Sequence, residues 1–144
     1  MAKQVYYEDV EVGMELPMLT KNPTTQQLVM YAGASGDFYQ IHYDKDFAQG
    51  NGLPGVILHG LLKAGFVGQL VTDWIGEGGT IKKLGVSYRG MDQPGVPLYV
   101  KGVVTNKYIK NGEGYVEADV WTENQQGQKT TPGTTTVILP RKKR

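Results

Sequence analysis

The sequence predicts a single α+β domain in which a curved antiparallel sheet wraps around one long central helix. Three observations carry this prediction. The chain has 144 residues, a length typical of one domain. A nearly continuous apolar helical pattern covers residues 59–74. Four segments with alternating apolar and polar residues follow it, separated by hairpin signals. We therefore expect one domain over residues 1–140 and a basic tail at residues 141–144.

The first part of the chain predicts a short strand, a helix and an irregular excursion. The strand covers residues 14–21, before an Asn-Pro pair. Thr24 is the expected N-cap of the helix, and Gly36 allows the helix to end. Residues 37–55 have no sustained period and are rich in glycine. We expect a loop there, with one turn near residues 44–49.

The second part predicts the central helix and most of the sheet. Residues 59–74 are apolar on nearly all sides, which is typical of a buried helix. Small residues spaced by four allow a neighbour to approach closely, namely Gly60, Ala64 and Gly68. Strands are expected near residues 84–89, 98–109, 115–122 and 129–139. Pro132 predicts an edge position or a bulge in the last strand.

A sheet wrapped around a single helix leaves strand edges and one flank of the helix uncovered. Exposed edges and apolar flanks are commonly covered by a second chain. We therefore expect at least a dimer.

Composition and charge exclude several classes of function. The chain has no cysteine, which excludes disulfides, thiolate nucleophiles and cysteine-rich metal sites. With only His42 and His59, we expect no metal. Residues 1–140 carry eleven basic and fourteen acidic side chains, so the body of the domain lacks the charge of a nucleic-acid binder. We interpret residues 141–144 as a solvated terminus.

The sequence also predicts a protein that works away from membranes. The N-terminus lacks the apolar run of a secretory signal. The longest apolar stretch, residues 56–75, is interrupted by polar and charged side chains, which makes it a poor membrane span. We expect a cytoplasmic protein.

Asp37 and His42 form the strongest candidate for chemistry. They are five residues apart, in a segment expected to be a loop just past a helix end. A loop can fold both side chains toward one point, where a carboxylate and an imidazole exchange protons near neutral pH. In the alternative interpretation, Asp37 turns the chain after Gly36 and His42 is a hydrogen-bonded structural residue.

His59 and Gly60 mark the start of the central helix. The first N–H groups of a helix lack internal partners and lie at the positive end of its dipole. That end can bind a carbonyl oxygen or an oxyanion, and Gly60 permits close approach of a ligand. Alternatively, Gly60 only allows tight packing.

These segments resemble a known family. The run YAGASGDFYQIHYDKDFA at residues 31–48 resembles the signature of the MaoC-like dehydratases, or (R)-specific enoyl-CoA hydratases. GVILHGLL at residues 55–62 resembles the segment that opens the family's central helix, and residues 88–98 resemble its strand and Pro-Gly turn. The chain is also similar in length and motifs to mycobacterial (3R)-hydroxyacyl-ACP dehydratase subunits. The resemblance implies a hot-dog fold.

Two positions depart from the family pattern. The chain has Tyr39-Gln40 where the family usually has Asn-Pro, and Val96 stands where the family has Asp. The first departure lies between the two expected catalytic residues, so it bears on loop rigidity and substrate shape.

The resemblance implies reversible hydration of trans-2-enoyl thioesters to (3R)-hydroxyacyl thioesters. Asp37 and His42 would hold a water. The Gly60 N–H would donate a hydrogen bond to the thioester oxygen, which gains negative charge during the reaction. No cofactor is expected. The implied partners are an acyl-CoA or acyl-ACP substrate and a second subunit, as a homodimer or a heterodimer.

The expected substrate contacts come from the same segments and from basic side chains. Core packing is the alternative for each apolar member. The expected acyl contacts are Phe38, Tyr39, Phe47 and Leu53, with His59 and Arg89 as further substrate-binding residues. A basic mouth for the carrier arm could come from Lys63, Lys82, Lys83 or Arg89.

Two other functions remain open at this level. A hot-dog thioesterase would hydrolyse the same substrates and release a free thiol. A non-catalytic acyl-binding subunit would need a catalytic partner, although such a subunit has no need to keep both Asp37 and His42.

Overall fold

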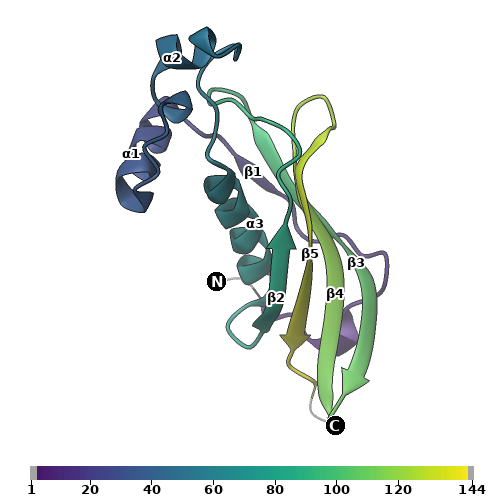
Figure 1. The fold of residues 1–144 in the computed structure, drawn as a ribbon. Coiled ribbons are helices and arrows are strands. Elements are labelled where there is room, and N and C mark those ends of the chain that lie inside the picture. Colours follow the sequence, from purple (N-terminus) through teal and green to yellow (C-terminus); the bar gives the residue numbers. More distant parts are fainter. Residues whose placement is uncertain (1–2, 143–144) are drawn as a thin grey trace.

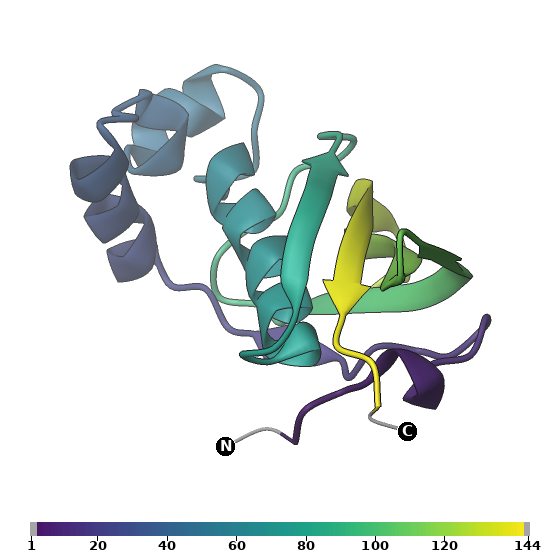
Figure 2. The same ribbon diagram turned by 90° about the horizontal axis from the view of Figure 1, so that it is seen from below.

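The computed structural model describes residues 3–142. A five-stranded antiparallel sheet curls around the long helix α3, and α1 and α2 lie outside the sheet near the N-terminal end of α3 (Figures 1 and 2). The helical elements are η1 (Tyr7–Asp9), α1 (Thr25–Ser35), η2 (Gln40–His42), α2 (Lys45–Gly50) and α3 (Gly60–Ile75). The strands are β1 (Leu19–Lys21), β2 (Thr80–Val86), β3 (Leu98–Lys110), β4 (Glu113–Glu123) and β5 (Lys129–Leu139).

The sheet has the strand order β1-β3-β4-β5-β2, which leaves β1 and β2 at its edges. The two expected hairpins join β3 to β4 and β4 to β5. Asn111 and Gly112 both have positive φ, 51° and 78°, as a tight turn between twisted strands requires. The β4–β5 turn closes around Asn124, whose side chain accepts the N–H groups of Gln126 and Gln128.

The core lies between α3 and the concave face of the sheet. Alternate residues of β3, β4 and β5 point toward the helix, as the period of a strand dictates. The buried apolar members on the helix are Leu62, Phe66, Val67, Leu70, Val71, Trp74 and Ile75, and those on the sheet include Leu98, Val100, Val104, Val116, Val120, Val137 and Leu139. The expected central helix is confirmed to within one residue at each end.

The sheet does not cover α3 on every side. Leu61 is 61% exposed, and Gly65 and Gln69 continue the same uncovered face. The expectation that one flank of the helix is left uncovered in a single chain is therefore confirmed. Among the helices of residues 3–142, none is both long and apolar enough to cross a membrane.

Two strands differ from their expected positions. β1 begins only at Leu19, with an isolated bridge at Glu15 before it, because Pro17 has no N–H to donate to a ladder. β2 lies at Thr80–Val86, rather than residues 84–89, and its register shifts between Ile81 and Lys83. That bulge breaks the alternation of side chains. The alternation of apolar and polar residues in the sequence therefore predicts only the second half of the strand.

Pro132 is not on an edge strand, because β5 lies between β4 and β2. Its carbonyl accepts the N–H of Ser87, just past the end of β2. A residue in an antiparallel ladder directs its N–H and its carbonyl to the same neighbour, so the proline lacks only the reciprocal bond to Ser87, where the β2–β5 ladder ends. The expected bulge is present, because Thr122 and Glu123 of β4 pair with Thr131 and Lys129 and leave Thr130 of β5 as the extra residue.

Part of the basic tail is held against the domain. The Arg141 guanidinium pairs with Glu8 at 2.8 Å, and the Lys142 ammonium pairs with Asp9. The backbone N–H of Lys142 also donates to the Glu8 carboxylate at 2.7 Å, and this bond, followed by that of Arg141, lowers the pKa of the Glu8 carboxyl. Residues 141 and 142 are thus exposed and also paired with the domain, and residues 143–144 lie outside the described part of the chain.

Gly133→Ala is expected to destabilise the domain by about 1–3 kcal/mol, the usual cost of overpacking. A Cβ at Gly133 would clash with the Gly85 carbonyl oxygen in the neighbouring strand. Gly33→Ala is the matched control, because a Cβ at this exposed position of α1 meets nothing within 4 Å. It should gain about 0.5–1 kcal/mol from helix propensity. Urea unfolding of both variants checks the prediction, and equal stabilities would contradict it.

Candidate active site

The end of helix α1 places Asp37. Gly36 takes a left-handed conformation, with φ 79°, and its N–H bonds the Ala32 carbonyl at 2.9 Å. The Asp37 N–H then donates to the Ser35 hydroxyl at 3.1 Å. The helix therefore ends sharply and leaves the Asp37 carboxylate 41% exposed on the loop that follows.

His42 lies at the end of η2 and is buried. Its Nδ1 is 2.8 Å from the carbonyl oxygen of Ile57. A carbonyl oxygen only accepts hydrogen bonds, so Nδ1 carries the hydrogen and Nε2 of the neutral ring carries the lone pair. Nε2 lies 3.9 Å from Oδ2 of Asp37. This distance is too long for a direct hydrogen bond and suits one bridging water.

His59 lies behind the pair. Its side chain is fully buried and stacks on the His42 ring, with centroids 3.9 Å apart and an interplanar angle of 22°. Its Nε2–H donates to the Asp37 carbonyl oxygen at 3.2 Å. The ring has no exposed surface in the single chain, so contact between His59 and substrate stays a prediction. His59 positions the backbone of Asp37 and the ring of His42.

The surroundings keep His59 neutral. Burial lowers the pKa of the His59 imidazole, and the neighbouring His42 lowers it further. Tyr31 of α1 meets His59 edge-on, with centroids 4.8 Å apart. Burial also raises the pKa of the Tyr31 phenol, with the Asp37 charge as the second cause. The rings behind the pair are thus neutral at physiological pH.

Gly60 begins α3, so its N–H has no acceptor within the helix. A Cβ at this position would lie 3.0 Å from the ring of Tyr88. The close neighbour that the small residue admits is therefore Tyr88 of the same chain. The Asp37–His42 pair and the first turn of α3 face the same end of the core, because His59 links them directly.

Residues 8–126 match the MaoC like domain. The chain belongs to this family. A relative in Mycobacterium tuberculosis, the beta subunit of a 3-oxo-4,17-pregnadiene-20-carboxyl-CoA hydratase, is 30% identical over 122 residues. The match covers 83% of this chain and 90% of the relative.

Solved structures of MaoC-like proteins have the same fold. The R-hydratase PhaJ1 of Pseudomonas aeruginosa superposes with a TM-score of 0.85 at 24% identity, over 96% of this chain and 88% of the other. The (R)-hydratase of A. caviae gives 0.80 at 25% identity, over 92% and 99%. The ChsH1-ChsH2 complex of M. tuberculosis gives 0.77 at 26% identity, over 90% and 98%. The expected hot-dog fold is confirmed.

The expected acyl contacts of this MaoC-like chain fall into two groups. Phe38 and Tyr39 lie beside the pair and are 59% and 54% exposed. The Tyr39 ring is 6.2 Å from the His42 ring and 6.0 Å from that of Phe47. Leu53 lies farther along, in the turn after α2, where its N–H bonds the Ala48 carbonyl. Phe38 and Tyr39 therefore form the exposed apolar surface next to the pair.

The expected basic mouth is not assembled. Lys63 is buried, and its ammonium lies 3.1 Å from the Asp92 carboxylate. Arg89 lines a separate hollow of about 320 Å³, together with Trp121 and Lys129. Lys82 and Lys83 lie exposed on β2. Lys63 is therefore wrong as a surface contact, and Arg89 does not join the pair within this chain.

Asp37, His42 and His59 have ligand-type atoms within 4.8 Å of one another. Ligands about 2.1 Å from one tetrahedral zinc ion would lie roughly 3.4 Å apart, so the group would have to contract to hold a metal. The arrangement fits proton transfer better than metal binding.

Two groups at this site were missed from the sequence. The Ile57 carbonyl leaves no signal, because any residue provides one. Asp92 did leave a signal, since a lysine within an apolar helix needs a buried partner. Lys63 was that lysine.

His59 should make the stability of the fold depend on pH below about 6.5, the ordinary pKa of histidine. Because its pKa is lowered in the folded state, the unfolded chain binds the proton more readily. Stability is then fully present above that pH and falls as the pH drops toward the folded pKa. Thermal unfolding from pH 8 to pH 5 measures this slope. His59→Gln should flatten it, whereas an equal slope in both proteins would contradict the assignment.

Proposed function

We propose that the chain adds water reversibly to trans-2-enoyl thioesters and forms (3R)-hydroxyacyl thioesters. One observation carries the proposal. The lone pair of His42 Nε2 faces the Asp37 carboxylate across 3.9 Å, a space suited to one water. Membership in the MaoC-like family and its hydratase relatives support this reaction.

In the forward reaction, His42 Nε2 accepts a proton from the water while Asp37 holds it. The water oxygen bonds to Cβ, and the π electrons move onto Cα and the thioester oxygen. The resulting enolate takes up a proton at Cα from the Asp37–His42 pair, which restores the site. One water is added overall. A positioned acid–base pair of this kind contributes about 10²–10⁴ in rate.

The N–H of Gly60 is our candidate donor to the enolate oxygen. It lies at the positive end of the α3 dipole and has no acceptor within the helix. Removing one such donor usually costs about 10²–10³ in rate. The adjacent Tyr88 ring would form a wall of the thioester channel.

The substrate class is an acyl thioester carried by CoA or acyl carrier protein. The M. tuberculosis relative is named as a subunit of a hydratase of a CoA thioester, which supports this class. Phe38 and Tyr39 are exposed next to the pair, and we assign them to the acyl group.

We also propose a homodimer, with the second copy covering the apolar surface beside the site. Exposed apolar side chains near the N-terminus of α3 support it, namely Phe38, Tyr39, Leu61, Tyr88 and Met91. The alternative is a heterodimer with a different subunit. It is supported by the relative named as a beta subunit and by the similar ChsH1-ChsH2 complex.

Asp37→Asn and His42→Ala should each lower hydratase kcat at least a hundredfold, because each removes half of the proton-transfer pair. Loss of the conjugated enoyl absorbance of crotonyl-CoA and longer enoyl-CoAs measures the rate. Asp46→Asn is the matched control, an exposed carboxylate on α2, and should keep the wild-type rate. Circular dichroism verifies that all variants fold.

Wild-type turnover in either Asp37→Asn or His42→Ala would refute the assignment. Free thiol released in step with the absorbance change would instead indicate a thioesterase.

Light scattering after size exclusion should give a mass twice the 15.8 kDa of one chain, because the apolar surface needs a cover. A monomer that hydrates enoyl thioesters at the full rate would contradict the homodimer. Activity that appears only after a second protein is added would favour the heterodimer.

A further inference from the structure

Lys63 and Asp92 form an ion pair in the interior. The ammonium of Lys63 lies 3.1 Å from the Asp92 carboxylate and 2.8 Å from the Gly90 carbonyl oxygen. The two side chains are only 3% and 6% exposed. Lys63 stands on α3 one turn after Gly60, and Asp92 lies on the segment between β2 and β3.

The contacts of this pair join two segments that border the proposed thioester site. The Asp92 carbonyl accepts the N–H of Leu58 at 2.8 Å, two residues before Gly60. The ring of Tyr88 lies against Gly60. Residues 88–92 are therefore joined to residues 58–63 by one backbone bond, by the packing of the Tyr88 ring and by Lys63, whose ammonium bonds both Gly90 and Asp92.

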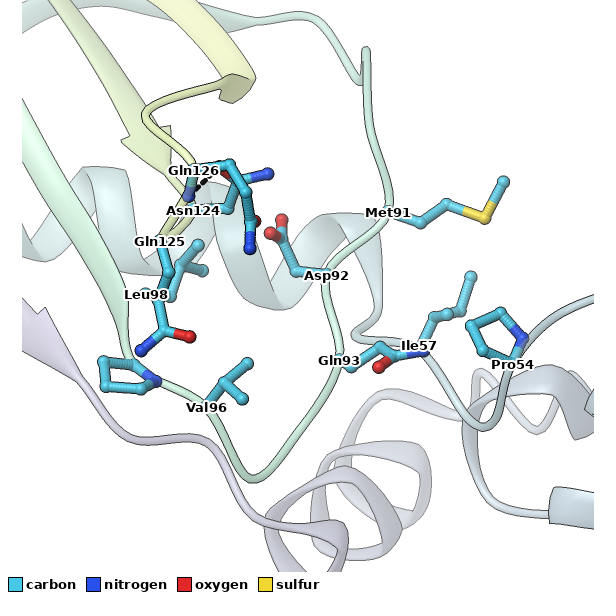
Figure 3. A pocket seen from close by; sticks show the side chains of 11 residues that line it. Pro54, Ile57, Met91, Asp92, Gln93, Val96, Leu98, Asn124, Gln125 and Gln126 are labelled. Carbon is cyan, nitrogen blue, oxygen red and sulfur yellow. Dashed lines mark hydrogen bonds between the residues drawn. The ribbon is translucent and has the colours of Figure 1, made fainter.

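Packing alone leaves room for this segment to move. Asp92 lines a cavity of about 270 Å³ between residues 91–98 and the β4–β5 turn. Figure 3 shows its carboxylate pointing into the space between its own backbone and that turn. A segment beside such a cavity makes fewer packing contacts on that side, so directional bonds contribute to holding its position.

The stability of the fold does not require a buried ion pair. Desolvation offsets most of the attraction between two buried charges, and well-packed apolar residues of similar volume are often as stable. An ion pair that contributes little to stability but holds residues 90–92 against α3 in a fixed orientation suits a positioning role.

We propose that Lys63 and Asp92 are positioning residues for the hydratase reaction. They hold the wall formed by residues 88–92 at a fixed separation from the first turn of α3, so that the thioester oxygen meets the Gly60 N–H. This inference rests on the proposed function. A misplacement of about 1 Å in such a site can cost a hundredfold in rate.

The test compares three changes in the full-length protein. Lys63→Met and Asp92→Leu are made singly and together, and Lys101→Met with Glu123→Leu is the matched control. Lys101 and Glu123 also form an ion pair, at 2.6 Å, between β3 and β4. Each single change at the buried pair leaves an unpaired charge and is expected to lower the melting temperature. The double change removes that penalty.

The double variant Lys63→Met/Asp92→Leu should melt near the wild-type temperature and lose about tenfold to a hundredfold in kcat, with a smaller change in KM. Hydrogen exchange measured by mass spectrometry should rise in residues 57–62 and 87–93. The control pair should leave kcat and this exchange pattern unchanged. If the pair were purely structural, kcat would fall only in variants whose melting temperature also falls.

Wild-type kcat in the stable double variant would overturn the inference, as would unchanged exchange in both segments. If the wild-type protein hydrates no enoyl thioester, the proposed function itself fails. The exchange measurement then still decides whether the pair holds the two segments together.

Discussion

The hydrogen bond from the His42 ring to the Ile57 carbonyl joins the loop after α1 to the strand-like segment that enters α3. The same two segments are also paired through the backbone, because the Ile57 N–H donates to the Ile41 carbonyl at 3.0 Å. The bond to the Ile57 carbonyl thus helps to fix the His42 ring. Because a carbonyl oxygen can only accept, the bond also sets the tautomer of the ring. Without it, the lone pair of Nε2 would have no fixed direction toward Asp37.

The curvature of the sheet explains why these groups meet at one end of α3. The sheet covers the apolar face of the helix, and the segment after β2 passes over the first turn, where Gly60 admits the ring of Tyr88. A larger residue at that position would push the segment away. The site is therefore formed by backbone groups of the helix on one side and by the loop after α1 on the other.

Local signals in the sequence predicted much of this arrangement. Thr24 caps α1 as expected, with its hydroxyl accepting the Gln27 N–H at 3.1 Å. Helix α3 and the turn at Asn111 are also predicted by their own residues, the helix by its apolar run and the turn by its Asn-Gly pair. The start of β2 is not, because the bulge near Lys82 breaks the alternation on which a strand prediction depends. The partners of Lys63 were also beyond local signals, since Asp92 is 29 residues away.

The same distinction separates the parts of the candidate site. The spacing of Asp37 and His42 predicts that they can meet, and the glycine before Asp37 makes the required turn. Their orientation depends on groups far along the chain, Ile57 for one ring nitrogen and His59 for the Asp37 carbonyl. His59 illustrates why residue type alone is insufficient. Two histidines stacked 3.9 Å apart are both buried, and the two rings differ in that Nε2 of His42 lies near the exposed carboxylate of Asp37, whereas Nε2 of His59 bonds a backbone carbonyl.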